Sequence, residues 1–242
     1  MAKEDLVIAG LPAAAEVFRI LDASSACEPA VEEGVEVRAG TKLAVVTGTS
    51  AALLCGERVA LNFLQRLCGI ATLTRQLKLC LAGLPVALLD TRKTTPGLRA
   101  LEKYAVRVGG GENHRLRLDD GILIKNNHLR LAGGVRAAVE RARSLRPSVA
   151  PELSIEVEVR SLTELREALD AGAEAVLLDN MTPDEVRECV AATARRVRLE
   201  VSGGINAANI RAYAETGVNA ISVGTLTHST PAADINFLIE PL

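Results

Sequence analysis

The sequence predicts an α/β protein in which a small N-terminal α/β unit is followed by a parallel α/β barrel. After Gly83, short apolar runs alternate with helical segments, and the last four runs recur at steps of roughly 20 residues, as in successive strand–helix units. Before Gly83, strand-like runs and turn glycines surround a few helical segments. We therefore expect a small α/β domain with connecting helices over residues 1–82 and a barrel domain over residues 83–242.

Composition places the chain among ordinary globular proteins. Its 242 residues are 48% hydrophobic and 24% charged with a net charge of -2, which gives no general attraction to nucleic acid or to a membrane surface. No apolar run reaches the ~18 residues of a membrane span, and the acidic opening of the chain is not that of a secretory signal. The five cysteines form no CxxC pair, as expected of thiols in a reducing compartment. We expect a cytoplasmic protein that binds neither nucleic acid nor membrane.

The N-terminal part is expected to contain a strand over Leu6–Ala9, a helix over Ala13–Leu21 and strand pieces within Val31–Thr47. Helical spacing of apolar residues then continues from Thr49 to about Leu81. Gly69 lies within this pattern, and we expect it to allow a division into two helices.

Six strands are expected in the barrel domain: Val86–Leu89, Ile122–Ile124, Ile155–Val159, Ala175–Leu178, Arg198–Val201 and Ala220–Val223. Helices are expected between them, for example over Leu162–Ala171 and Pro183–Ala194. Almost every strand is followed by a polar or glycine-bearing segment. Because the carboxyl ends of barrel strands converge on one face, where active sites lie, we expect these segments to form one site.

A local surplus of positive charge runs from Arg92 to Lys125, where eight lysines and arginines occur with four acids. Arg92, Lys93, Arg115 and Lys125 lie at strand ends or in a polar turn. Arginine grips a carboxylate with two hydrogen bonds, and lysine acts as a point charge, so these cations indicate a small polyanionic ligand. His114 and His128 are expected to donate or orient within the same site. Part of the surplus is expected to be a solvated helix face, formed by Arg99, Lys103 and Arg107.

Acidic residues follow on two neighbouring strands. Glu156 and Glu158 alternate on one side of their strand, and Asp179 ends the next strand. Two interpretations remain open: a divalent metal held partly by these carboxylates and partly by substrate phosphates, as Mg²⁺ prefers, or salt bridges inside the barrel with Lys125 or Arg115.

Glycines and serines end the last two strands. After Ser202, two glycines allow backbone N–H groups to approach a ligand, and a helix is expected to begin at about Asn206. Late strand–helix loops build the phosphate site in many barrels. We therefore expect phosphate to bind at Ser202, Gly203, Gly204, Ser222, Val223 and Gly224.

Several strings carry a family resemblance: ERVALNFL (57–64), GIAT (69–72), DTRKTTPG (90–97), KYAVR (103–107), GGG (109–111), NHR (113–115), LLDN (177–180) and SGGI (202–205). Together they resemble the quinolinate phosphoribosyltransferases, also called nicotinate-nucleotide pyrophosphorylases (carboxylating). DTRKTTPG alone is highly specific, and the strings run in family order along nearly the whole chain.

The resemblance implies a reaction and an assembly. Quinolinate and phosphoribosyl pyrophosphate would give nicotinate mononucleotide, pyrophosphate and CO₂ with Mg²⁺, a pentosyl transfer (a glycosyltransferase reaction) in NAD biosynthesis. The fold would be an N-terminal α/β sandwich over residues 1–82 followed by an incomplete parallel α/β barrel over residues 83–242, the catalytic domain. The chain would form a homodimer or a higher oligomer in which Arg58 reaches the neighbouring subunit's site.

The resemblance also implies roles for individual residues. The catalytic residues would be Lys93, near the pyrophosphate, and Glu158 and Asp179, facing the ribose and the metal. Quinolinate carboxylates would be held by Arg92, His114, Arg115 and Lys125. Thr91 would belong to the substrate-binding set, and phosphate would be bound by the glycine and serine residues that end the last two strands.

Two departures from the family pattern are expected to matter. Family members carry roughly 40 further residues before position 1, so the sandwich is expected to be truncated. Asn126 stands where the family usually has an acid, which is expected to weaken a contact that orients Lys125. Three alternatives remain: a paralogue associated with molybdate-transport genes, an inactive protein that binds phosphoribosyl ligands, and a lipoyl-like carrier, which is disfavoured because no carrier lysine is present.

Overall fold

The computed structural model describes residues 1–240 and divides into two compact units, each built from separate stretches of the chain. Unit 1 contains Met1–Gln76, Lys93–Gly111 and Thr225–Leu242, and unit 2 contains Leu77–Arg92 and Glu112–Gly224. The domain boundary at residue 82 stays a prediction. Among residues 1–240, no helix is long and apolar enough to cross a membrane.

Unit 1 contains two small antiparallel sheets and four helices, one of which continues into unit 2. Strand β1 pairs with β3, and β2 pairs with β4. The expected strand and helix near the N-terminus are confirmed, although β2 was not expected. The bounds are β1 Leu6–Val7, α1 Leu11–Leu21, β2 Ala26–Pro29, β3 Glu36–Val37, β4 Ala44–Thr47, α2 Ser50–Cys80, α3 Arg99–Val108 and α9 Thr225–His228.

The core of unit 1 is formed where α1 and α2 pack on the small sheets. Pro12 stands in the first turn of α1, where its fixed φ suits a helix start and its missing N–H costs nothing. Phe18, on the buried face of α1, stacks on Phe237 with ring centroids 5.8 Å apart. Burying a side chain of this size stabilises the fold by about 2 kcal/mol. The other core residues include Leu6, Ile8, Leu11, Leu61, Leu64, Cys68 and Ile235.

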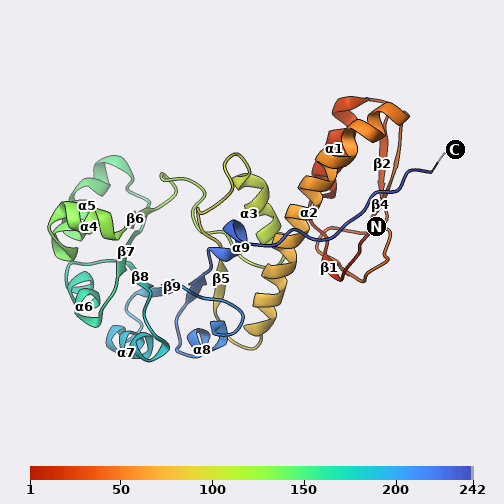
Figure 1. Cartoon of the computed structure of the whole chain (residues 1–242). Coiled ribbons are helices and arrows are strands. Elements are labelled where there is room, and N and C mark those ends of the chain that lie inside the picture. The colour runs from red at the N-terminus through yellow and green to blue at the C-terminus, as the bar shows by residue number, and fades with distance from the viewer. Residues whose placement is uncertain (241–242) are drawn as a thin grey trace. The chain divides into compact units, whose positions relative to one another are not determined.

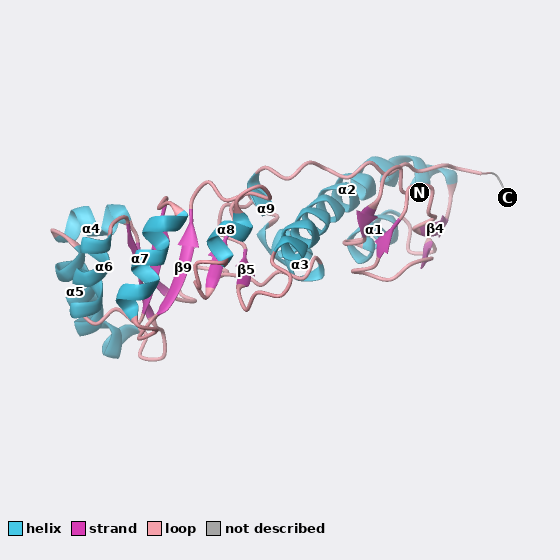
Figure 2. Ribbon diagram, turned by 90° about the horizontal axis from the view of Figure 1, so that it is seen from below, coloured by secondary structure: helices cyan, strands magenta, loops and turns pink. Residues whose placement is uncertain are grey.

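Helix α2 is one uninterrupted helix of 31 residues, which Figure 2 shows plainly. The expected division at Gly69 is therefore wrong. A Cβ atom at Gly69 would lie 2.1 Å from the carbonyl oxygen of Pro231, so no larger residue fits without movement of the backbone. The glycine permits close packing of the C-terminal segment on the helix rather than a break.

Unit 2 is a six-stranded parallel sheet in the order β5-β10-β9-β8-β7-β6. Helices α4 to α8 lie along the outer face of the strands (Figure 1). β5 and β6 end the order unpaired with each other, so the barrel is incomplete, as the family resemblance implies. The bounds are β5 Ala87–Leu89, β6 Ile122–Ile124, α4 Asn126–Ala132, α5 Val135–Val149, β7 Ile155–Val159, α6 Leu162–Asp170, β8 Ala175–Asp179, α7 Pro183–Thr193, β9 Arg198–Ser202, α8 Ile210–Ala214 and β10 Ala220–Ser222.

The register of the sheet brings the strand ends level with one another. Ser222 lies opposite both Leu89 and Ser202, and Ser202 lies opposite Asp179. On the other side, Val159 lies opposite Leu178. All strands run in the same direction, so the segments that follow them emerge at one edge of the sheet.

We expect Gly69→Ala to lower the free energy of unfolding by about 2 kcal/mol, because the new methyl group overpacks against the backbone at Pro231. Urea unfolding followed by circular dichroism measures the change. Asn62→Ala, on the exposed face of the same helix, is the control and should leave the midpoint nearly unchanged. Equal stability of the two variants would contradict the packing role of Gly69.

Candidate active site

The turn after α3 is fixed to the end of β5 by a buried carboxylate. Asp90 is fully buried and accepts hydrogen bonds from Asn113 Nδ2 at 2.7 Å and from the His114 backbone N–H at 2.9 Å. The backbone adds a parallel bridge between Leu89 and Glu112. These contacts place the Asn113-His114-Arg115 segment, predicted to bind the ligand, along β5.

Arg92 and Arg115 bring two positive charges close together within unit 2. Burial lowers the pKa of Arg115, and the nearby charge of Arg92 lowers it further. One nitrogen of Arg115, Nη1, donates to the Gly121 carbonyl at 3.0 Å. Two guanidinium groups that repel each other are stabilised by an anion between or beside them, which agrees with the predicted polyanionic ligand.

His114 lies between two glutamates inside the barrel. Its Nε2 atom is 3.5 Å from Glu156 Oε2 and 3.6 Å from Glu200 Oε1. Burial disfavours the charged imidazolium, but the hydrogen bond to Glu156 and the charges of both carboxylates outweigh it and raise the pKa of His114. Burial, together with the charge of Glu156, raises the pKa of Glu200, which is 1% exposed. The role of Glu200 was missed, although alternation along its strand points it inward.

His114, Glu156 and Glu200 offer three ligand atoms within 4.8 Å of one another and could hold a metal ion. The hydrogen bonds of His114 favour a proton on its Nε2 atom over a metal ion between the three side chains. Nδ1 of His114 accepts the Arg115 backbone N–H at 2.7 Å, so the ring proton lies on Nε2 and faces the carboxylates. An imidazole ligand also suits Mg²⁺ poorly, because this ion prefers oxygen.

Glu158 and Asp179 lie at the carboxyl edge and each faces a cation. Lys125 Nζ donates to Glu158 Oε2 at 3.3 Å, and Arg160 donates to Asp179 Oδ2 at 3.1 Å. The salt bridge to Lys125, one of the two open interpretations, is confirmed. Glu158 also accepts the Asn126 backbone N–H at 3.2 Å, so it orients Lys125 where the side chain of Asn126 offers no charge.

His128 orients the same lysine through the backbone. Its Nδ1 atom accepts the Lys125 N–H at 2.8 Å and caps the start of α4. The expectation that His128 orients a residue of the site agrees with this contact.

The two glycines after β9 both adopt left-handed backbone conformations. φ is 102° at Gly203 and 63° at Gly204, and a Cβ atom on Gly203 would lie 2.3 Å from Asn180 Oδ1. Glycine is therefore required at this turn. The helix start expected at Asn206 is wrong, because α8 begins at Ile210 after a turn in which Asn206 Oδ1 accepts the Ala208 N–H. Phosphate binding by the glycine backbone stays a prediction.

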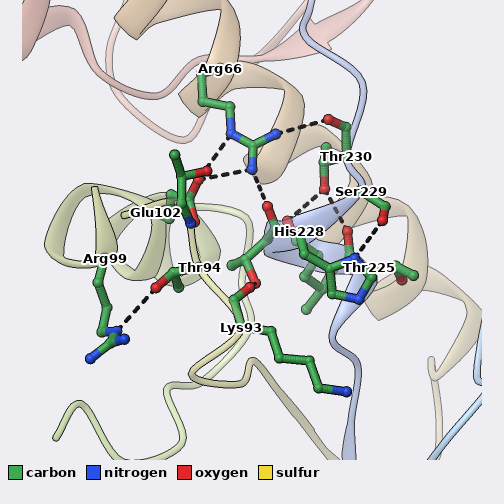
Figure 3. A network of polar contacts seen from close by, with 12 residues as sticks. Arg66, Lys93, Thr94, Arg99, Glu102, Thr225, His228, Ser229 and Thr230 are labelled. Atoms are coloured by element: carbon green, nitrogen blue, oxygen red, sulfur yellow. Dashed lines mark hydrogen bonds and ion pairs between the residues drawn. The ribbon is translucent and has the colours of Figure 1, made fainter. Parts of the chain in front are cut away.

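The remaining predicted residues lie in unit 1. Arg58 is highly exposed on α2, and its Nη2 atom is 3.8 Å from a carboxylate oxygen of Glu57. Lys93 is exposed and belongs to a loop that a network of polar contacts fixes (Figure 3). The expected solvated face of α3 is wrong at Lys103, which is 1% exposed, although Arg107 is exposed. The spacing of charged residues alone does not distinguish an exposed lysine from one on the buried face of a helix.

A cavity of about 530 Å³ in unit 2 adjoins part of this machinery. Its walls include Asn113, His114, Arg115 and Glu156, together with Ser154 and Arg198 near the start of β7 and β9. Of the predicted site residues, the cavity wall contains His114 and Arg115. Thr91, Lys125, Glu158, Asp179 and the serine and glycine residues at the ends of β9 and β10 are not in that wall. They lie at or just after the carboxyl ends of the strands.

Comparison with known proteins identifies the family. The profile of the quinolinate phosphoribosyl transferase N-terminal domain matches residues 1–68, and that of the C-terminal domain matches residues 70–238. The chain belongs to the quinolinate phosphoribosyltransferase family. The matched residues include the two arginines, the His114 segment and the glycines described above.

Individual members of the quinolinate phosphoribosyltransferase family are similar over nearly the whole chain. A probable nicotinate-nucleotide pyrophosphorylase [carboxylating] of Bacillus subtilis is 44% identical over 236 residues, covering 98% of this chain and 81% of that protein. A quinolinate phosphoribosyltransferase [decarboxylating] of Nicotiana tabacum is 38% identical, covering 99% and 72%. The solved nicotinate-nucleotide pyrophosphorylase of Francisella tularensis has a TM-score of 0.90 at 40% identity, covering 97% and 82%.

We expect Glu156→Gln to lower the pKa of His114, because the substitution removes a negative charge beside the ring and weakens its hydrogen bond. The pH titration of labelled histidine signals by NMR measures the shift, with His114→Gln to assign the resonance. Glu152→Gln, an exposed glutamate four residues earlier, is the control. An unchanged His114 titration in Glu156→Gln would show that Glu156 does not stabilise the imidazolium.

Proposed function

We propose that this chain transfers the phosphoribosyl group of phosphoribosyl pyrophosphate to quinolinate and releases CO₂, forming nicotinate mononucleotide and pyrophosphate in NAD biosynthesis. Membership of the family supports this reaction. The observation that carries it at the level of residues is the place of Arg115 in the wall of the cavity in unit 2, with the charge of Arg92 acting on it, because guanidiniums complement the carboxylates of a dianion.

Quinolinate is held in this proposal by its two carboxylates. Arg92 and Arg115 bind them with paired hydrogen bonds, and Lys125 adds a point charge. Neutral His114 fixes the Arg115 backbone through Nδ1. When protonated, the ring adds positive charge, but Nδ1 then carries a proton and no longer accepts this hydrogen bond. Thr91, next to Arg92, completes the substrate-binding set.

The phosphoribosyl side of the site is supported by the acids and glycines of the later strands. Breaking the bond between ribose and pyrophosphate builds positive charge on the sugar, which Glu158 and Asp179 stabilise. The backbone of Ser202–Gly204 and of Ser222–Gly224 binds phosphate. After the pyridine nitrogen is alkylated, the carboxylate leaves as CO₂ and its bonding electrons stay on the ring carbon, stabilised by the cationic ring. A proton from water then takes the place of CO₂ on that carbon.

Glu158 and Asp179 would be the oxygen ligands of Mg²⁺ from neighbouring strands at the carboxyl edge, and binding of the ion would replace their ion pairs with Lys125 and Arg160. These two residues would hold the ion together with the phosphates of the substrate. When bound, Mg²⁺ neutralises phosphate charge. Lys93 gives the leaving pyrophosphate a further positive charge.

We further propose a cytoplasmic homodimer, or a higher oligomer, in which Arg58 enters the neighbouring subunit's site. The exposure of the Arg58 side chain supports this role, since a side chain must lie on the surface of its own subunit to contact a neighbouring one. The paralogue associated with molybdate-transport genes is not favoured, because the relatives that match almost the whole chain are named for quinolinate chemistry.

The direct test is an assay of the purified protein with quinolinate, phosphoribosyl pyrophosphate and Mg²⁺. We expect nicotinate mononucleotide and CO₂ to form in equal amounts. A folded protein that binds phosphoribosyl pyrophosphate without turnover would be an inactive binding protein, and the enzyme proposal would be wrong.

We expect Arg115→Ala to weaken quinolinate binding about 10- to 100-fold, as expected for the loss of charge-assisted hydrogen bonds. Binding of phosphoribosyl pyrophosphate should change little. Calorimetric titration with each substrate measures both affinities. Arg117→Ala, an exposed arginine paired with Asp119, is the matched control. Equal weakening of both substrates by Arg115→Ala would contradict the division of roles.

A further inference from the structure

The loop that carries Lys93 is fixed by polar contacts within unit 1 (Figure 3). The carbonyl oxygen of Lys93 accepts a hydrogen bond of 2.7 Å from Thr227 Oγ1. Two residues later, the backbone N–H of Thr95 donates to Glu102 Oε2 at 3.1 Å. Thr227 and Glu102 are both fully buried, so water does not compete for these contacts.

The two residues that hold the loop are joined by Arg66 of α2. Its Nε and Nη2 atoms donate to Glu102 Oε1 at 3.0 and 2.8 Å. The same guanidinium donates to the carbonyl oxygen of Thr227, and through Nη1 to that of Thr230 at 2.9 Å. One arginine therefore fixes the C-terminal segment against α3, and the Thr227 hydroxyl connects that segment to the loop.

We propose that Thr227 is a positioning residue for Lys93: its hydroxyl, held in place through Arg66 and Glu102, sets the backbone from which the Lys93 amine reaches pyrophosphate. Figure 3 shows that amine extending away from the network, while the backbone is bound to it. The inference rests on the proposed function, in which Lys93 neutralises the leaving pyrophosphate. Thr227 itself contacts the loop and is assigned no contact with substrate.

A hydroxyl group can affect turnover in this way although one hydrogen bond contributes little to stability. A displacement of about 1 Å in a group that acts on the reacting atoms can reduce the rate about 100-fold. Valine at position 227 keeps the shape of the side chain but cannot donate to the Lys93 carbonyl. Serine keeps the donor and should restore the position of the loop.

The first experiment compares Thr227→Val with Thr230→Val. Thr230 is a matched control, because it is also buried but its hydroxyl donates to carbonyl groups of its own segment, at Thr225 and Leu226. We expect Thr227→Val to lower kcat/KM for phosphoribosyl pyrophosphate about tenfold. Quinolinate affinity should change less than about twofold, and Thr227→Ser should recover most of the activity. Equal kcat/KM in Thr227→Val and Thr230→Val would overturn the proposal.

A double variant tests whether the effect passes through Lys93. Lys93→Ala removes the amine, so adding Thr227→Val to it should cause no further loss of kcat/KM. A further tenfold loss in the double variant would show that Thr227 acts by another route, against the proposal.

Hydrogen exchange separates this inference from the proposed function, since it needs no turnover. We expect Thr227→Val to accelerate exchange at the Thr95 amide, while Thr230→Val leaves it near the wild-type rate. Unchanged exchange in Thr227→Val would overturn the positioning role even in an active enzyme. Faster exchange in a protein that forms no nicotinate mononucleotide would leave Thr227 holding the loop and would instead overturn the proposed function.

Discussion

The parallel pairing of six strands is the constraint on which the arrangement of unit 2 depends. Parallel neighbours require a long connection between them, which here includes a helix for every pair, and the carboxyl ends then meet at one edge. Residues as distant in sequence as Asp90, Asp179 and Ser222 come to lie along the same edge of the sheet through register alone. A polar residue at a strand end can therefore serve chemistry without disturbing the apolar runs that form the sheet.

Groups of opposite charge lie near one another within unit 2. The guanidiniums of Arg92 and Arg115 lie close together, and the carboxylates of Glu156 and Glu200 lie beside the intervening residue, His114. A buried carboxylate without compensation is unfavourable, and so is a pair of adjacent arginines. Against the effect of burial, the carboxylates raise the pKa of His114, and the charge of Arg115 opposes them. The charge at this position thus depends on both sets of neighbours.

Much of the barrel could be predicted from the sequence. Its strands are short apolar runs bounded by polar turns, so the limits of β6 and β7 agree with the expectation residue for residue. β2 was missed because its residues, Ala26–Pro29, are mostly exposed and show no apolar alternation. The local sequence of β2 therefore gives no sign of its pairing with β4.

The site was harder to predict, for physical reasons that differ between residues. Lys103 has the spacing of a surface lysine, and its burial depends on packing that no periodicity reveals. Glycine has a low helix propensity, but Gly69 is needed because the backbone at Pro231, far along the chain, packs directly against it. Glu200 is one inward residue of a strand, and only the fold brings it to His114. Motifs at strand ends were found because the fold repeats them, whereas single tertiary contacts were not.

The bridge between Leu89 and Glu112 has a consequence for how this enzyme family can change. β5 is an edge strand, and the segment that leads into His114 and Arg115 covers part of its open side with backbone hydrogen bonds. The proposed substrate recognition and the protection of a sheet edge are thus encoded in the same few residues. An insertion or deletion that retunes specificity there would also uncover an edge strand, which favours self-association of the chain. Ligand preference in the family can therefore change more easily by substitutions in this segment than by insertions or deletions in it.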